Sequence, residues 1–151
     1  MPMLLCVGAI NTFLIDKKLR GYVSINVQSG EALDTHSFAT LIGVGATTIN
    51  PYLAFDSLFQ RYEKKLFDQY GFDECVLRYI KSVNSGLLKI MSKMGISVLS
   101  SYRGGCNFET VGLSRTIVDD YFPGVISKIS GIGLNGIEKK IRQIHKEAFE
   151  S

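Results

Sequence analysis

Three glycines near the end of the chain have the spacing of a dinucleotide-binding turn. Gly131, Gly133 and Gly136 satisfy the pattern G-x-G-x-x-G, between a segment expected to be extended and one expected to be helical. Such a turn brings backbone amides close to a pyrophosphate at a helix N-terminus. A dinucleotide unit also needs an acidic residue on a second strand about 20 positions further on, which the sequence ending at Ser151 does not provide. We therefore interpret the glycines as a loop and keep a cofactor site as the alternative.

The segment from Tyr102 to Gly105 has the composition of an anion site. We predict that it follows a strand and begins a helix, and ligands of parallel α/β folds bind beyond the carboxyl ends of strands. A helix N-terminus beside Arg103 suits a phosphate or a carboxylate. The alternative is that Arg103 pairs with a structural carboxylate such as Glu109. The sequence leaves both interpretations open.

No arrangement of residues in the sequence predicts a nucleophile with its base. His36 and His145 lack a partner pattern for metal binding or for a catalytic triad, and no HExxH, GxSxG or P-loop motif occurs. The three cysteines, Cys6, Cys75 and Cys106, are widely separated, so they predict free thiols rather than a metal site. We expect no catalytic residue and no metal site in this sequence.

Hydrophobic periodicity predicts helices that alternate with short strands. Strands are expected near residues 22–27, 46–49 and 96–100, and an extended segment over 125–130. The expected helices cover residues 4–20, residues 34–42 with Asp34 as cap, a segment from Asn50-Pro51 to Gly71, residues 73–94, a short one after Gly104-Gly105, one capped by Ser114, and one capped by Asn135 with Ile137, Ile141 and Ile144 facing inward.

This alternation predicts an α/β fold with a partial βα arrangement and about three short parallel strands. The clearest helix follows Asp73, where apolar residues recur at spacings of three and four and are expected to form a continuous buried stripe. The residues of this stripe are Val76, Ile80, Val83, Leu87, Met91 and Met94. Three strands with few covering helices indicate an incomplete fold.

The bulk composition describes an ordinary globular chain. It has 151 residues, 46% hydrophobic and 21% charged, which fits one compact unit and argues against disorder. The net charge of +3 is too small and too interleaved with acidic residues to predict a nucleic-acid surface. No apolar run has the roughly 20 residues needed to span a membrane. We expect a cytoplasmic protein with neither a nucleic-acid nor a membrane partner.

Several long strings of residues resemble the glutamate synthase large subunit. They are Ser29 to Ala32, Phe38-Ala39, Leu41 to Gly43, Gly45-Ala46, Ile49 to Phe55, Gly86 to Ser97, Ser101 to Gly104, and Val111 to Leu113. The similarity extends over almost the whole chain and corresponds to the end of the central domain and the lead-in to the FMN-binding domain. It implies a division into residues 1–72, central-domain-like, and 73–151, leading into the FMN barrel.

The resemblance implies a reaction for the parent enzyme. Family members take the amide nitrogen of glutamine, pass ammonia through a tunnel, and reduce 2-iminoglutarate to glutamate, using FMN and an iron–sulfur cluster. The parts that hold the catalytic cysteine, most of the FMN site and the cluster have no counterpart in this sequence, so no cofactor is expected here. The candidates for ligand or domain contacts are Asn50, Tyr52, Tyr102, Arg103, Gly104 and Glu109.

The sequence departs from the family at polar positions. Asn11-Thr12-Phe13 stands where the family has a run of histidines, and Gly105-Cys106-Asn107 replaces Ala-Gln-Ile. We expect a truncated or split piece, inactive alone, that supplies scaffold and domain coupling, including the ammonia passage around Gly43 to Tyr52. Its partners would be the amidotransferase and FMN parts. The alternatives are a stand-alone anion- or nucleotide-binding domain and a non-functional remnant.

Overall fold

The computed structural model describes residues 1–67 and 69–150. Its internal contacts divide the chain into two compact units: unit 1, residues 1–23 and 106–151, and unit 2, residues 24–105. Each unit contains one two-stranded parallel sheet together with helices. The predicted α/β class with short parallel strands is therefore confirmed. The division at residue 72 refers to domains of the parent enzyme and stays a prediction.

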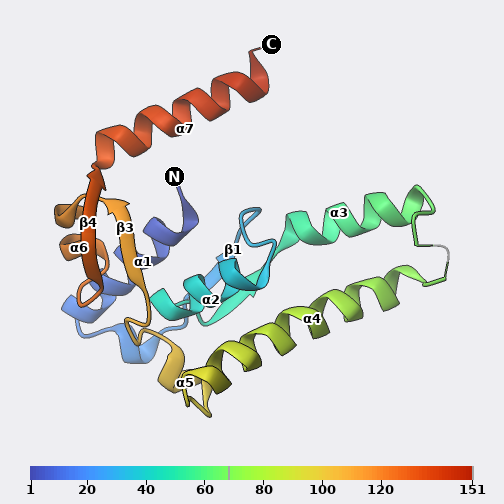
Figure 1. Ribbon diagram of the computed structural model, residues 1–151, viewed down its shortest axis with the longest axis horizontal. Coiled ribbons are helices and arrows are strands. Elements are labelled where there is room, and N and C mark those ends of the chain that lie inside the picture. The colour runs from blue at the N-terminus through green and yellow to red at the C-terminus, as the bar shows by residue number, and fades with distance from the viewer. Residues whose placement is uncertain (68, 151) are drawn as a thin grey trace. The chain divides into compact units, whose positions relative to one another are not determined.

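Unit 2 is built on a strand–helix–strand segment followed by a long helical hairpin (Figure 1). Strands β1 and β2 pair in parallel, with Asn26 opposite Thr48, and α2 is the crossover between them. The elements are β1 (Asn26–Gln28), α2 (Thr35–Val44), β2 (Thr48–Asn50), α3 (Tyr52–Glu63), α4 (Phe72–Lys93) and α5 (Leu99–Tyr102).

Helix α2 forms the centre of unit 2, and its ends follow from its sequence. The Asp34 carboxylate accepts a hydrogen bond from the Ser37 amide at 2.8 Å, which caps the helix as predicted. The side-chain and backbone hydrogen bonds from Ser37 lower the pKa of Asp34 below its ordinary value. Gly45 ends the helix with φ of +132°, a conformation that favours glycine. Between these caps the helix buries Phe38, Ala39, Leu41 and Ile42.

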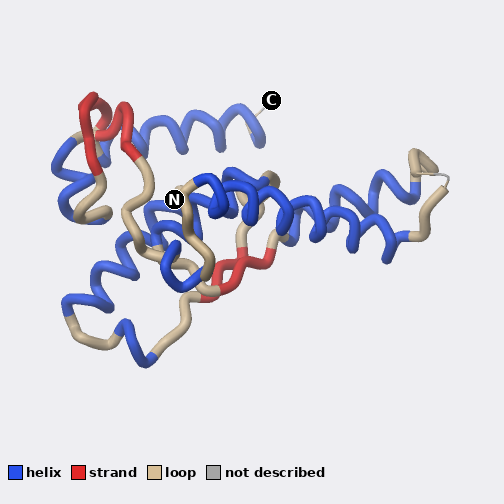
Figure 2. Tube along the Cα trace, turned by 60° about the horizontal axis from the view of Figure 1, so that its bottom comes forward, coloured by secondary structure: helices blue, strands red, loops and turns tan. Residues whose placement is uncertain are grey.

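Helices α3 and α4 run side by side as a hairpin (Figures 1 and 2). Edge-on aromatic contacts join them, with ring centroids 5.9 Å apart for Phe55 and Tyr79 and 5.3 Å apart for Phe59 and Phe72. Gly86 lets α4 approach the start of α2, because a Cβ there would lie 2.5 Å from Cγ2 of Thr35. In the part of the chain that is described, no helix combines the length and apolar character needed to cross a membrane.

Unit 1 contains the second strand–helix–strand segment. Its elements are α1 (Met3–Asp16), the 3-10 turn η1 (Arg20–Tyr22), β3 (Glu109–Leu113), α6 (Arg115–Tyr121), β4 (Ile126–Ile132) and α7 (Leu134–Phe149). Helix α1 packs against α6, and Val7, Val118 and Phe122 are buried. Ser114 caps α6 by accepting from the Ile117 amide at 3.3 Å, which confirms the predicted cap.

One strand prediction and one helix prediction are wrong, and a second strand is shorter than predicted. Residues 96–100, predicted as a strand, form a loop with a bend at Val98 and the start of the short helix α5, because no strand in the described part of the chain pairs with them. The helix predicted after Gly104-Gly105 is instead β3, whose Thr110 and Val111 pair with β4. The strand predicted over residues 22–27 begins only at Asn26, because η1 occupies its start.

Three predicted helix ends also differ from the structure. Asn50 is the last residue of β2, so Pro51 rather than Asn50 precedes the first turn of α3. That helix ends at Glu63 and not near Gly71, because Lys65 turns the chain with φ of +55°. At α7 the N-cap is Gly133, and Asn135 lies inside the helix.

The backbones of β3 and β4 come unusually close at two glycines. A Cβ on Gly131 would lie 2.1 Å from the carbonyl oxygen of Gly112 and 2.6 Å from its Cα. No rotation of a side chain relieves such a contact, because the obstructing atoms belong to the backbone. Strand packing alone therefore requires glycine at position 131, the first glycine of the G-x-G-x-x-G pattern.

We expect Gly131→Ala to lower the free energy of unfolding by about 2 kcal/mol or more, as overpacking against backbone does. The matched control is Gly21→Ala in the same unit, where an added Cβ meets nothing within 4 Å. This control should change stability by no more than about 0.5 kcal/mol. Urea denaturation of both variants measures the difference, and equal stabilities would contradict the strand-packing explanation.

Candidate functional site

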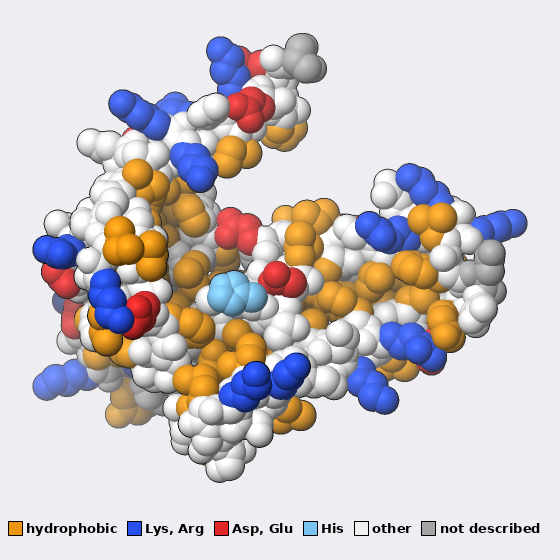
Figure 3. Space-filling view, viewed as in Figure 1, with side chains coloured by type: hydrophobic (Ala, Val, Ile, Leu, Met, Phe, Trp, Pro, Cys, Tyr) orange, Lys and Arg blue, Asp and Glu red, His pale blue; other side chains and the backbone are white. Residues whose placement is uncertain are grey.

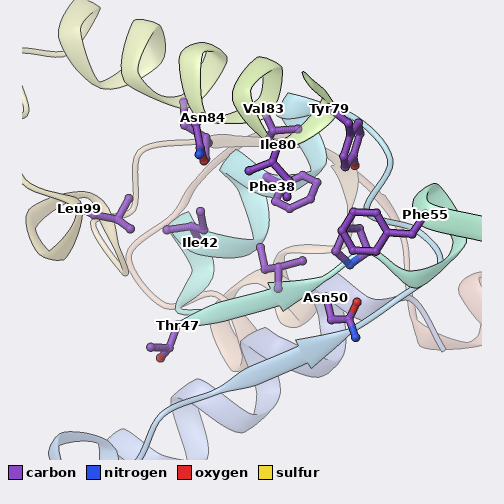
Figure 4. Close-up of a pocket in the computed structure, with 13 residues that line it drawn as sticks. Phe38, Ile42, Thr47, Asn50, Phe55, Tyr79, Ile80, Val83, Asn84 and Leu99 are labelled. Carbon is purple, nitrogen blue, oxygen red and sulfur yellow. The ribbon is translucent and has the colours of Figure 1, made fainter. Parts of the chain in front are cut away.

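An apolar pocket of about 440 Å³ opens in unit 2 between α2, α4 and the corner where β2 meets α3 (Figure 4). Phe38 and Ile42 from α2 point into it from one side, and Ile80 and Val83 from α4 point into it from another (Figure 4). Phe55 and Leu99 complete much of its wall. Ligand pockets in proteins are typically concave and mostly apolar, so this is a candidate site.

The pocket changes the interpretation of the stripe on α4. Val83 and Met91 are buried as predicted, but Ile80 is 40% exposed and Met94 is 42% exposed. The prediction of a continuous buried stripe is therefore wrong. The middle of the stripe faces the pocket instead, because α2 and α3 do not close over it. Sequence periodicity found these residues but could not distinguish a core from an open pocket.

Polar groups are few at the pocket, and they do not form a catalytic arrangement. Tyr79 donates its hydroxyl hydrogen to the Leu33 carbonyl at 3.1 Å, and burial together with the negative charge of Asp34 raises its pKa. Asn50 and Asn84 contribute carboxamides to the lining. These groups suit the binding of an apolar side chain with a few hydrogen bonds at its edge.

Two of the predicted site residues hold α2 in place. The Tyr102 side chain is 1% exposed and donates a hydrogen bond from its hydroxyl to the Ala39 carbonyl at 3.2 Å. Gly104, with φ of +71°, donates its amide to the Gly43 carbonyl at 2.9 Å. This carbonyl lies in the last turn of α2, where no amide of the same helix is available to it. Burial also raises the pKa of the Tyr102 hydroxyl.

Arg103 was predicted to lie at a helix N-terminus, but the structure places it at the C-terminal end of α5. It follows the last residue of α5, and its amide donates back to the Leu99 carbonyl at 3.0 Å. The predicted anion site therefore lacks the free backbone amides that a helix N-terminus would have provided. The alternative pairing with Glu109 gains no support, because the Glu109 carboxylate pairs with Lys128 at 2.7 Å across β3 and β4.

Asn50 and Tyr52 lie together at the corner between β2 and α3. The Asn50 carbonyl accepts the Ser29 amide at 3.1 Å, which continues the pairing of β1 with β2. Tyr52 is 44% exposed, and its hydroxyl approaches Gly30 closely enough to lie 3.1 Å from a Cβ placed there. Asn50 lines the pocket, whereas Tyr52 is not one of its lining residues.

The glycine-rich turn does not fit a nucleotide phosphate. A depression at the start of α7 is lined by Ser114, Thr116, Gly133 and also Asp120, whose carboxylate would repel an anion.

Among the described residues, no three His, Cys, Asp or Glu side chains gather into a group that could hold a metal ion. Cys6 and Cys106 lie in unit 1 and Cys75 in unit 2, and all three thiols are free.

Fold and site together describe an α/β segment whose conspicuous polar residues support its own helices. Residues 1–114 match the family model of the glutamate synthase central domain. The chain therefore belongs to the glutamate synthase central domain family. Its match of 53% identity over 149 residues to the NADPH glutamate synthase large chain of Azospirillum brasilense covers 99% of this chain and 10% of that relative.

Other glutamate synthases match the same segment. The large chain of NADPH glutamate synthase from Bacillus subtilis is 47% identical over 150 residues. The chloroplastic ferredoxin-dependent glutamate synthase of Spinacia oleracea is 40% identical over 158 residues. Each of these alignments covers 99% of this chain and 10% of the relative. The chain thus spans about a tenth of the length of the curated relatives it matches.

We expect Tyr102→Phe to lower the free energy of unfolding by about 1 kcal/mol, because a buried hydrogen bond is lost while the ring stays. Tyr22→Phe is the matched control, since Tyr22 is 86% exposed. The raised pKa of Tyr102 also predicts a pH dependence of the free energy of unfolding. The unfolded chain ionises this tyrosine first, so its contribution to stability declines as the pH rises above about 10.

Thermal denaturation of wild type and both variants between neutral pH and about pH 11 makes the comparison. Tyr102→Phe should lose less stability than wild type over the alkaline part of this range. A Tyr102→Phe protein with wild-type stability and wild-type pH dependence would show that the hydroxyl does not support α2.

Proposed function

We propose that this chain is a scaffold segment of a glutamate synthase, which converts glutamine and 2-oxoglutarate to two molecules of glutamate. The observation that carries the proposal is the use of Tyr102 and Gly104, two of the residues that suggested a ligand site. Both are engaged in hydrogen bonds to the carbonyls of Ala39 and Gly43 in α2. The Tyr102 hydroxyl and the Gly104 amide are engaged in positioning this helix, so we do not assign them to substrate binding.

The proposal assigns the chemistry to other parts of the enzyme. FMN would supply the electrons for reduction of 2-iminoglutarate, and an iron–sulfur cluster would deliver them, both held outside this segment. The amidotransferase and FMN parts are the proposed partners, in the cytoplasm, without nucleic acid or membrane. The extent of the relatives supports this assignment, because nine tenths of their length lies outside the match.

Domain coupling is the second part of the proposed role. The hairpin of α3 and α4 exposes apolar side chains over its surface, with hydrophobic groups visible between the two helices (Figure 3). Leu53 is 43% exposed, Leu77 61% and Leu88 66%. Apolar surface of this kind on a domain supports contact with a neighbouring part of a larger protein.

A chimeric enzyme tests the proposal. The matching segment of the Azospirillum brasilense large chain is replaced by this chain, and glutamine-dependent glutamate formation and FMN content are measured in the complete enzyme. Because 53% of the aligned residues are identical, a segment that supplies only scaffold should replace its counterpart in the relative's enzyme. We expect normal FMN content and activity within about tenfold of wild type, a difference of about 1.4 kcal/mol.

A chimera that folds and holds FMN but forms no glutamate from glutamine would contradict the scaffold role, since this segment would then lack a required residue. The control is the same chimera with Asn11-Thr12-Phe13 changed to histidines, which the family resemblance places at these positions. Activity that returns only in this control would assign the missing function to that triplet.

A stand-alone anion- or nucleotide-binding domain is less well supported. Asp120 at the glycine-rich turn and the position of Arg103 after α5 both argue against an anion site. A thermal-shift measurement with FMN, NADPH, 2-oxoglutarate and phosphate distinguishes the two proposals. A ligand at 100 times its dissociation constant would stabilise the chain by about 2.7 kcal/mol. The scaffold proposal expects no such shift.

A further inference from the structure

Helix α7 of unit 1 carries an apolar stripe with the spacing of a coiled-coil seam. None of the residues of α7 is buried, and Ile144 is 56% exposed. The stripe advances by three, four, three and four residues, as positions a and d of a heptad do. Its members are Leu134, Ile137, Ile141, Ile144 and Ala148. The sequence prediction that Ile137, Ile141 and Ile144 face inward is therefore only partly met.

The stripe borders open space within unit 1. A groove of about 340 Å³ has Ile137, Ile141 and Ile144 along one wall, and its other wall includes Leu5 and Phe122. Hydrophobic side chains appear along one side of α7 in Figure 3, and basic side chains appear beside them. The apolar face of α7 is thus left open to a further helix.

Charged residues flank the seam in a pattern that a second copy of α7 would complement. Positions e carry Glu138 and His145, and positions g carry Lys140 and Glu147. In an antiparallel pair with Ile141 of one copy against Ile144 of the other, Lys140 faces the second copy's Glu147. Glu138 then faces the second copy's His145.

Other arrangements of two α7 helices lack this complementarity. A parallel pair would place Lys140 near the second copy's His145, without an opposite charge. An antiparallel pair shifted by one seam layer, with Ile137 against Ile141, would place Lys140 against Lys140 and Glu138 against Glu138. Like charges in these positions are unfavourable. The charges therefore select one orientation and one register.

We propose that two copies of this chain associate through α7 in this antiparallel register, with the apolar stripe as the shared core. The interface is isologous, because every contact occurs twice about a two-fold axis between residues 142 and 143. Within each helix Glu138 contacts Arg142 at 2.8 Å and Glu147 contacts Gln143 at 2.8 Å. These exposed contacts leave the apolar seam accessible.

The interface is small, so the dimer should be weak and reversible, with a dissociation constant between micromolar and millimolar. Sedimentation equilibrium of the full chain at low salt over this concentration range measures it. Lys140→Glu removes an opposite-charge pair twice and introduces repulsion twice, and it should weaken association about tenfold. Lys139→Glu is the matched control, because it makes the same charge change on the outer face of α7.

The double variant Lys140→Glu/Glu147→Lys should restore association to near the wild-type value. These two residues lie seven positions apart, about 10.5 Å along the helix, which is too far for pairing within one α7. Rescue would therefore come from contact between copies. Far-UV circular dichroism of each variant confirms that α7 remains helical.

A monomer at all concentrations would overturn the proposal. So would association that is equally sensitive to Lys139→Glu and Lys140→Glu, or a double variant as weak as Lys140→Glu. Association unchanged by Lys140→Glu would indicate the register with like charges and would also overturn it. None of these outcomes bears on the scaffold role tested with the chimera.

Discussion

The attachment of the segment 102–104 to α2 is the constraint on which unit 2 depends. Helix α2 lies between β1 and β2 along the chain, and its buried side chains form much of the core of this unit. Asp34 caps its first turn, whereas Tyr102 binds the carbonyl of Ala39 near its middle and Gly104 binds the carbonyl of Gly43 in its last turn, both from a distant part of the sequence. The pocket wall formed by Phe38 and Ile42 is positioned by the same helix.

A second constraint is that, among the residues that the structure describes, each unit has only two parallel strands. Parallel sheets in proteins are normally covered on both faces, yet Val111 on β3 is 66% exposed and Ile129 on β4 is 60% exposed. The close contact of Gly112 with Gly131 and the Glu109–Lys128 ion pair hold these two strands together. Units of this kind suit a segment that is completed by neighbouring structure, in agreement with the proposed scaffold role.

Sequence patterns located the elements whose ends carry local signals. Asp34 and Ser114 cap their helices through their own side chains, and Gly45 ends α2 with a positive φ, so short-range chemistry sufficed. The segment around Ile96 and Val98 has β-branched residues but no neighbouring strand, and local propensity could not reveal that absence. Register and pairing depend on distant residues, which periodicity does not report.

The candidate site was predictable to a similar extent. Tyr102 and Gly104 were identified as special, but their partners Ala39 and Gly43 lie more than 60 residues away in the sequence, so their supporting role emerged only from the fold. Ile80 and Val83 were found by their helical spacing, whereas Phe38 and Phe55 join them at the pocket through tertiary contacts.

Native-state hydrogen exchange at the Gly104 amide measures whether the segment 102–104 supports α2. If its bond to the Gly43 carbonyl supports α2, this amide should exchange through the same opening as the α2 amides, with protection within about tenfold of theirs. If the Gly104 amide instead exchanges as fast as that of exposed Gly21 while the α2 amides remain protected, α2 does not depend on this hydrogen bond.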